Sequence, residues 1–115
     1  MNALIVDDET IITKVLSSYL KKKECTCIIA NDLNSAKYNY APNTYVLILT
    51  DINLTRNGEE GIELIKYIKS INPDEEIYAM TGRPENEERI LEAGAKKVIM
   101  KPFRLKTIDE LINWN

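Results

Sequence analysis

Histidine is absent from the 115 residues of this chain. Its absence excludes catalytic triads that use histidine, zinc sites with imidazole ligands, and phosphorylation of a histidine within this chain. Cysteine is nearly absent too, because Cys25 and Cys27 are too few for a disulfide framework and their C-x-C spacing differs from the C-x-x-C redox motif. We therefore expect two reduced thiols with no metal between them, in a cytoplasmic protein.

The chain also lacks a long apolar run and an excess of positive charge. The first apolar run, 3–6, is followed at once by two aspartates, so it is too short for a signal peptide or a membrane span. Lys and Arg number 15 against 18 Asp and Glu, a formal net charge of -3, so we expect no direct nucleic-acid binding and no membrane binding. The length predicts a single domain over residues 1–115.

Five short apolar runs alternate with longer stretches of helical periodicity. The runs are residues 3–6, 26–30, 45–50, 76–80 and 97–100. Most are apolar at consecutive positions, which is typical of strands covered on both faces of a parallel sheet. The stretches of helical spacing are residues 11–20, 32–40, 59–71, 84–93 and 105–112. This alternation predicts an α/β fold in which a five-stranded parallel sheet is doubly wound by helices on both faces.

Helix boundary signals agree with this pattern. Asn31-Asp32 is a start signal for the second helix, and Glu59 and Glu60 suit the beginning of the third. Asn72-Pro73 is expected to stop the third helix and Gly94 the fourth. The basic run 21–23 is interpreted as a solvated end of the first helix rather than as a docking patch.

Polar residues follow four of the five predicted strands. They are Asp7, Asp8, Asp51, Thr81 and Lys101. The carboxyl ends of parallel strands share one edge of the sheet, and ligands bind beyond that edge where the strand order reverses. If the first and third strands are neighbours, the three aspartates converge there.

The charge of such a cluster favours a divalent cation. Two like charges about 4 Å apart repel by about 4 kcal/mol at an effective dielectric constant of about 20, so either a carboxylate takes up a proton or a cation enters. Oxygen ligands without imidazole or a nearby thiol favour Mg²⁺, or Mn²⁺, over zinc. Each residue also has a structural interpretation: Asp7-Asp8 as a helix cap, Asp51 and Thr81 as turn residues, Lys101 as a solvated side chain.

Four motifs together resemble a known family. LIVDDE at 4–9, LILTDINL at 47–54, MTG at 80–82 and KPF at 101–103 occur in the order and spacing of the receiver domains of two-component response regulators, of the chemotaxis regulator type. The resemblance implies a flavodoxin-like (βα)5 fold with strand order 2-1-3-4-5. It also implies a single receiver domain over 1–115, with no output domain in this chain and no turnover of an external substrate.

The resemblance implies a role for each acidic residue. Asp51 is the phosphoacceptor and also a metal ligand. Asp8 binds Mg²⁺ directly and Asp7 binds it through water. The backbone carbonyl of Asn53 supplies a further ligand.

It implies further roles for the residues after the fourth and fifth strands. Thr81 hydrogen-bonds the phosphoryl group, Lys101 pairs with a phosphoryl oxygen, and the Lys101-Pro102 bond is cis. The phosphoryl donor is a sensor histidine kinase or a histidine phosphotransfer protein, since this chain has no histidine. Phosphorylation shifts a conformational equilibrium that changes binding of a downstream protein at the face formed by the fourth helix, fifth strand and fifth helix.

Three positions depart from the family pattern. Thr55 stands where proline is usual, and Gly61 follows about two residues late, so the loop from Asn53 to Gly61 is long. Val98 occupies the switch position, which is often aromatic, and valine cannot move between buried and exposed positions as a ring does. Gly82 stands where alanine is common, and both residues are small.

Two other functions fit parts of the sequence. A haloacid dehalogenase-type phosphatase uses an Asp-x-Asp-x-Thr motif, and residues 51–55 read D-I-N-L-T, but Asn53 removes the second carboxylate. A degenerate receiver that serves as a scaffold or dimerisation module is compatible with Val98. The intact Asp8, Asp51, Thr81 and Lys101 favour a working phosphoacceptor instead.

Overall fold

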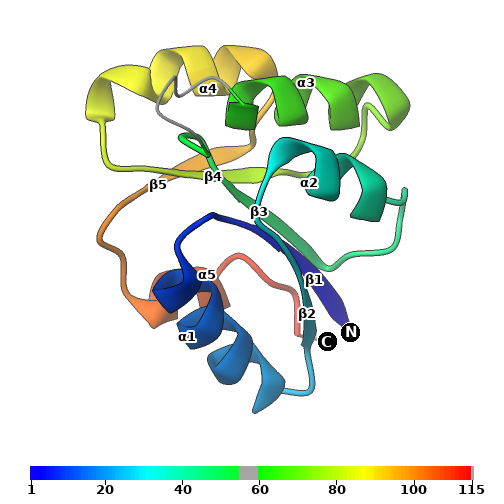
Figure 1. Ribbon diagram of the computed structural model, residues 1–115, viewed down its shortest axis with the longest axis vertical. Helices are drawn as coiled ribbons and strands as arrows, with labels where there is room; N and C mark the ends of the chain where they lie inside the picture. Colours follow the sequence, from blue (N-terminus) through cyan, green and yellow to red (C-terminus); the bar gives the residue numbers. More distant parts are fainter. Residues whose placement is uncertain (55–59, 115) are drawn as a thin grey trace.

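The computed structural model describes residues 1–54 and 60–114 and shows a parallel sheet between two layers of helices (Figure 1). The five strands lie in the order β2-β1-β3-β4-β5, and every neighbouring pair is parallel. They are β1 (Asn2–Val6), β2 (Thr26–Ala30), β3 (Leu47–Asp51), β4 (Tyr78–Thr81) and β5 (Lys97–Met100). The predicted fold class and strand order are confirmed.

Helices cover both faces of this sheet. They are α1 (Thr10–Lys21), α2 (Leu33–Asn39), α3 (Glu60–Ile71), α4 (Glu87–Ala93) and α5 (Leu105–Asp109), with a 3-10 turn, η1 (Pro84–Asn86), before α4. Figure 1 shows α1 and α5 on one side and α2, α3 and α4 on the other. Among the described residues no helix combines the length and the apolarity that crossing a bilayer requires.

The strands are apolar at consecutive positions because each strand contributes side chains to two hydrophobic cores, one on each face of the sheet. In β1, Leu4 and Val6 belong to the core under α2, α3 and α4, whereas Ala3 and Ile5 belong to the core under α1 and α5. All four side chains are fully buried. A strand with only one covered face would alternate apolar and polar residues instead. The sheet edge that carries the site is therefore held by packing from both sides.

Several predicted boundaries are confirmed and others are wrong. Asp32 caps α2, with its Oδ1 accepting the N–H of Ser35 at 2.7 Å, and Gly94 ends α4 at a φ of 120°. β3 runs over 47–51 rather than 45–50, and β4 over 78–81 rather than 76–80. The fourth helix begins with η1, and α5 ends at Asp109 rather than at residue 112. Glu59 lies outside the described residues, and α3 ends at Ile71 as the following Asn-Pro predicts.

The two ends of α1 differ from expectation. The apolar stripe of this helix is not fully covered, because Ile11 is 79% exposed and Val15 48% exposed while Leu16 is buried. The basic end is not simply solvated either. Lys23 lies 2.7 Å from the carboxylate of Asp109 at the end of α5, and its ammonium sits 5.4 Å from the centre of the Trp114 ring. The start of α1 is thus exposed, whereas the residues that follow its end contact the end of α5.

Candidate functional site

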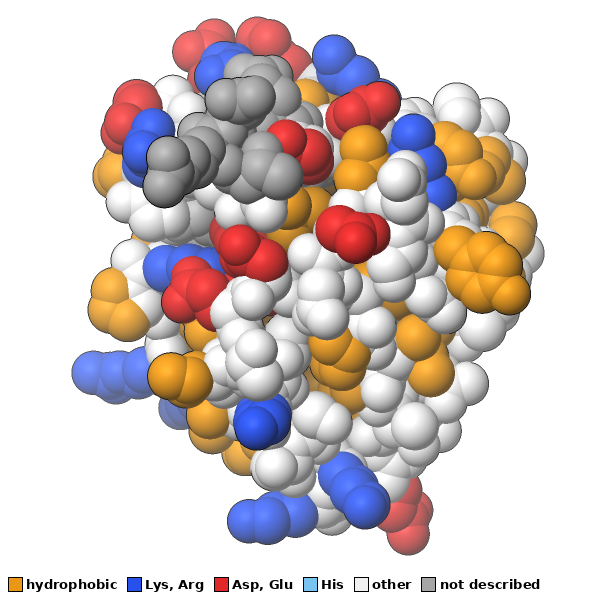
Figure 2. Space-filling model, viewed as in Figure 1, with side chains coloured by type: hydrophobic (Ala, Val, Ile, Leu, Met, Phe, Trp, Pro, Cys, Tyr) orange, Lys and Arg blue, Asp and Glu red, His pale blue; other side chains and the backbone are white. Residues whose placement is uncertain are grey.

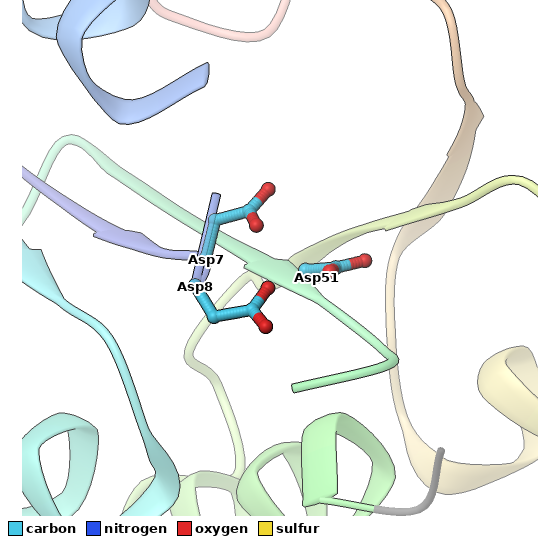
Figure 3. Close-up of side chains that lie close together, drawn as sticks. All are labelled: Asp7, Asp8 and Asp51. Atoms are coloured by element: carbon cyan, nitrogen blue, oxygen red, sulfur yellow. The ribbon is translucent and has the colours of Figure 1, made fainter. Parts of the chain in front are cut away.

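β1 and β3 lie side by side at the centre of the sheet, and an acidic residue stands at the carboxyl end of each. Val6 pairs with Thr50, so Asp7 and Asp51 come next at the same level. One carboxylate oxygen from each of Asp7, Asp8 and Asp51 lies within 4.8 Å of the others. Figure 3 shows the three carboxylates turned to the same side of the strand ends. Asp7 and Asp51 are buried and Asp8 is exposed, so solvent reaches the cluster on the side of Asp8.

Lys101 brings a positive charge to this pocket from the far edge of the sheet. It follows β5, its backbone N–H donates to the carbonyl of Thr81 at 2.9 Å, and its peptide bond to Pro102 is cis. Its Nζ lies 3.0 Å from Asp7 and 3.4 Å from Asp51. It also lies 3.4 Å from Glu9, a partner that the sequence analysis did not find. Lys101 is therefore an internal partner of the acidic cluster rather than a solvated side chain.

The interpretation of Asp7-Asp8 as a cap of the first helix is wrong. The N-cap residue of α1 is Glu9, and it makes no side-chain capping hydrogen bond. Asp7 Oδ1 instead accepts the backbone N–H of Glu9 at 2.9 Å, which fixes the turn between β1 and α1. The carboxylate of Asp7 thus belongs to the acidic cluster and also stabilises the turn between β1 and α1.

Burial and crowding change the protonation of these groups. Burial raises the pKa of Asp51 from 3.8 to about 6, the charge of Asp7 adds to the increase, and Lys101 opposes it. Burial also raises the pKa of Asp7, although the N–H of Glu9 and the ammonium of Lys101 counteract the change. Burial alone would lower the pKa of Lys101, but the hydrogen bond to Asp7 and the charge of Asp51 outweigh it and raise that pKa. One lysine does not balance the carboxylates.

Thr81 and Gly82 stand at the carboxyl end of β4, the strand that pairs with β3. Thr81 ends β4, is buried, and its Oγ accepts the N–H of Arg83 at 3.1 Å. A hydroxyl that accepts one hydrogen bond can still donate its own proton to an oxygen ligand. A Cβ on Gly82 would meet no heavy atom within 4 Å, so glycine leaves space beside Thr81.

The segment after Asp51 is held close to the start of α3. The N–H of Gly61 donates to the carbonyl of Ile52 at 3.1 Å. A Cβ on Gly61 would lie 2.5 Å from both the carbonyl oxygen of Asp51 and the Cα of Ile52, so glycine is required there. The N–H of Asn53 hydrogen-bonds the Asp51 carboxylate and lowers its pKa. Thr55 and the centre of the long loop lie outside the described residues.

Val98 occupies the position of the expected switch residue and is half-buried in β5. It packs against the core under α2, α3 and α4. Because Val98 is aliphatic, it has no ring that could rotate towards Thr81. Tyr78 in β4 is the aromatic residue nearest to Val98 in sequence, and it is buried in the opposite core.

The donor set of the cluster suits a hard divalent cation. All three side chains offer oxygen, two of them from buried positions, and the chain has no imidazole. Cys25 directly precedes β2 and Cys27 is its second residue, so both thiols lie at the amino ends of the strands, away from the cluster at the carboxyl ends. Carboxylate oxygens without nitrogen or sulfur favour Mg²⁺ or Mn²⁺ over zinc. The residues therefore fit magnesium.

Comparison with known sequences gives one consistent family. The family model described as the response regulator receiver domain matches residues 3–113. The sensory transduction protein LytR of Staphylococcus haemolyticus is 30% identical over 115 residues, which cover 98% of this chain and 44% of LytR. The transcription factor SKN7 of Saccharomyces cerevisiae is 29% identical over 104 residues, which cover 89% of this chain and 16% of SKN7. The chain thus spans less than half the length of these relatives.

Solved structures with the same fold agree. A response regulator receiver domain protein from Methanospirillum hungatei is 30% identical and superposes with a TM-score of 0.80, over 95% of this chain and 90% of its own. The non-phosphorylated receiver domain of HemR from Leptospira biflexa is 25% identical, with a TM-score of 0.83 over 96% of this chain and 89% of its own.

Proposed function

Because the chain belongs to the response regulator receiver domains of two-component signalling, we propose that it accepts a phosphoryl group on Asp51 in a magnesium-dependent reaction. The observation that carries the proposal is the convergence of Asp7, Asp8, Asp51 and Lys101 at one edge of the sheet. These residues come from three separate strand ends, which a set of unrelated caps and turns would not bring together. Receiver domains are signalling modules, and we expect no turnover of an external substrate.

Asp51 is suited to be the nucleophile. Burial raises its pKa to about 6, still below 7, so the carboxylate form with its available oxygen lone pair predominates at neutral pH. That oxygen attacks phosphorus while the bond to the donor's leaving group breaks, and an acyl phosphate forms on the protein. The transfer requires alignment and charge neutralisation more than proton movement. The hydrogen bond from Asn53 and the packing of Gly61 against the Asp51 backbone orient the carboxylate.

The remaining residues neutralise charge and hold the product. Lys101, already 3.4 Å from Asp51, pairs with a phosphoryl oxygen, and the hydroxyl of Thr81 donates to another. Asp8 would bind the metal directly, Asp7 through water, and Asn53 through its backbone carbonyl. Bound Mg²⁺ would supply charge neutralisation for the carboxylates and the transferred group.

The donor and the recipient of the signal follow from the same chemistry. A sensor histidine kinase or a histidine phosphotransfer protein supplies the phosphoryl group, because this chain has no histidine. Capture of the new dianion by Thr81 shifts the loop after β4 and changes the face formed by α4, β5 and α5, to which a downstream protein binds. Typical couplings of about 1–3 kcal/mol are sufficient to change partner affinity. We place this reaction in the cytoplasm.

A degenerate receiver is the second candidate, favoured by Val98 at the switch position. The family assignment leaves the phosphatase interpretation without support. Under the scaffold alternative the pocket binds neither phosphoryl group nor mimic, and Asp51 has no covalent role.

Incubation with Mg²⁺ and acetyl phosphate tests the proposal. We expect the intact mass to increase by one phosphoryl group, and the adduct to be absent in Asp51→Asn and without divalent metal. Beryllofluoride with Mg²⁺ should change the spectrum of the parent chain and leave Asp51→Asn unaffected. Steady release of phosphate without an adduct would point to a phosphatase, and no response to either reagent would point to the degenerate receiver.

A further inference from the structure

Glutamate is an unusual residue at the N-cap of α1. Glu9 occupies this position, yet its side chain makes no capping hydrogen bond. Serine, threonine, aspartate and asparagine are preferred at N-caps because their short side chains accept the free N–H groups of the first turn. The backbone of Glu9 is fixed nonetheless, since its N–H donates to Asp7 Oδ1 at 2.9 Å. The carboxylate of Glu9 therefore makes its contact elsewhere than in the helix.

That contact is with the ammonium of Lys101. Glu9 Oε1 lies 3.4 Å from Lys101 Nζ, on the solvent side of the site, since the Glu9 side chain is 60% exposed. Two further carboxylates contact the same ammonium from inside, Asp7 at 3.0 Å and Asp51 at 3.4 Å, and both are buried. Lys101 is thus held between one outer carboxylate and two inner ones.

The outer carboxylate differs from the inner ones in what else it binds. Among the described residues, the three carboxylates whose oxygens lie within 4.8 Å of one another are Asp7, Asp8 and Asp51, and Glu9 stands outside this group. A divalent cation in the cluster, with a phosphoryl group on Asp51, would draw on the inner oxygens that Lys101 contacts. The carboxylate of Glu9 would remain for the ammonium. Because an ammonium has three N–H donors, one bond to Glu9 leaves two for phosphoryl oxygens.

We propose that Glu9 is a positioning residue for Lys101, which holds the ammonium beside the phosphoryl group once the metal and that group occupy the inner carboxylates. The inference rests on the proposed function of Asp51. Glu9 would touch neither the metal nor the reacting atoms, so its effect passes through Lys101. Without this outer partner the ammonium would stay with the inner carboxylates, where it competes with the cation and is less constrained beside the transferred oxygens.

Exchange of Glu9 for aspartate separates the reach of the side chain from its charge. Glu9→Asp keeps the carboxylate but shortens the side chain by one methylene, and aspartate at an N-cap turns to the N–H groups of its own helix. We expect acetyl phosphate to phosphorylate this variant about fivefold more slowly at saturating Mg²⁺, the upper end for an exposed ion pair. Titration calorimetry should show Mg²⁺ binding weakened by about threefold. The melting temperature should not fall, because aspartate is the better capping residue.

A double-variant cycle shows whether the effect passes through the lysine. In the Lys101→Ala background, the further change Glu9→Asp should alter neither the rate nor the affinity for Mg²⁺. Glu9→Gln loses the charge but keeps an oxygen at the same reach, and it should retain more of the rate than Glu9→Asp. Glu87→Asp is the matched control, because Glu87 is an exposed glutamate at the start of α4, and it should change neither quantity.

The outcomes distinguish this inference from the proposed function. An adduct that forms equally fast in Glu9→Asp, or a loss that is as large in the Lys101→Ala background, would overturn the positioning role alone. So would the order expected from charge alone, in which Glu9→Gln is altered and Glu9→Asp is unchanged. If the parent chain formed no adduct at all, the function of Asp51 itself would be refuted, and the positioning role with it.

Discussion

Lys101 supplies positive charge to the acidic cluster. Its ammonium lies among Asp7 at 3.0 Å, Asp51 at 3.4 Å and Glu9 at 3.4 Å, and it is only 16% exposed. Figure 2 shows acidic side chains gathered beside a basic one near the carboxyl ends of the central strands. A cation that entered the cluster would share these carboxylates with Lys101, so under the proposed function the lysine would oppose metal binding and assist phosphoryl binding.

Removal of this charge should separate the two effects. We expect Lys101→Ala to bind Mg²⁺ about tenfold more tightly, a change of about 1.4 kcal/mol, because a neighbouring positive charge is lost. Its phosphorylation by acetyl phosphate should fall at least about tenfold, because the transferred oxygens lose their partner. Titration calorimetry measures the first quantity and intact mass against time the second. Lys97→Ala, an equal charge change on the exposed side of β5, should alter neither, and weaker Mg²⁺ binding by Lys101→Ala would contradict the competition.

At the scale of elements, the start of α3 packs closely against the end of β3. Gly61 lies in the first turn of α3 against the backbone of Asp51 and Ile52. Alanine is intrinsically favoured over glycine in a helix by about 1 kcal/mol. The Cβ of alanine at residue 61 would lie 2.5 Å from backbone atoms that cannot rotate away, and this overlap should outweigh the propensity.

Two glycine variants test that fit. We expect Gly61→Ala to lower the free energy of unfolding by about 1–3 kcal/mol, the usual cost of overpacking, and to slow phosphorylation of Asp51. Gly82→Ala is the matched control, since its Cβ meets nothing within 4 Å, and its stability should be unchanged or slightly higher. Urea unfolding of both variants measures the difference. Equal stabilities would mean that α3 moves freely relative to the site.

The second close fit joins α1 to α5. Lys23 donates to both carboxylate oxygens of Asp109, and the hydroxyl of Tyr19 donates to the same carboxylate. These contacts lower the pKa of Asp109 and raise that of Lys23. The ammonium also lies over the rings of Tyr19 and Trp114, at 5.0 and 5.4 Å. Because α5 is a single short helix, these contacts determine how its end is held.

Substitution of Asp109 should therefore loosen α5. In Asp109→Asn the ammonium of Lys23 loses its charged partner, and we expect a lower melting temperature and a changed emission of Trp114, the only tryptophan in the chain. Asp74→Asn, a charge-matched control on the turn after α3, should leave the emission unchanged. An unaltered spectrum in Asp109→Asn would show that Trp114 is held by packing alone.

The bounds of helices and strands were predictable where a single residue marks them. They were less predictable where contacts with other segments determine them. Asp32 and Gly94 mark their helix ends through their own side chain or backbone. Tyr45 and Glu76 were assigned to strands, yet the hydroxyl of Tyr45 donates to the carbonyl of Asn39 and Glu76 pairs with Lys96 at 3.0 Å. Asn39 and Lys96 lie in other segments, so the sequence pattern around Tyr45 and Glu76 does not reveal these contacts.

At the scale of the whole molecule, the sheet and its acidic cluster were largely predictable. Consecutive apolar residues reflect burial on both faces, Asp51 ends β3, and Asp7 and Lys101 stand directly after β1 and β5. The contact of Glu9 with Lys101 and the exposure of Ile11 were not predictable. Both depend on how segments far apart in the sequence pack together, which periodicity does not report.

The stability of the whole domain should depend on pH through its buried carboxylates. The pKa of Asp51 is raised from 3.8 to about 6, and that of Asp7 is raised too. Between these values the native state holds a proton that the unfolded chain has released, so the free energy of unfolding falls as pH rises from about 4 to 6. Asp51 alone accounts for up to about 3 kcal/mol, at about 1.4 kcal/mol for each pH unit.

Thermal unfolding without metal tests this dependence. The melting temperature should decrease from pH 5 to pH 7, and about 10 mM Mg²⁺ at pH 7 should restore much of the loss by binding the native state. Asp51→Asn should flatten the pH profile. A melting temperature that rises with pH over this range in the metal-free protein would contradict the raised pKa of Asp51.

The residues of the acidic pocket lie far apart along the chain, from Asp7 in the first turn to Lys101 after the last strand. A polypeptide still emerging from the ribosome therefore has the aspartates long before it has the lysine, and Lys101 reaches Asp7 and Asp51 only when β5 has joined the sheet. The acidic cluster of a nascent chain therefore lacks its positive partner until the last strand has been made and has paired with β4.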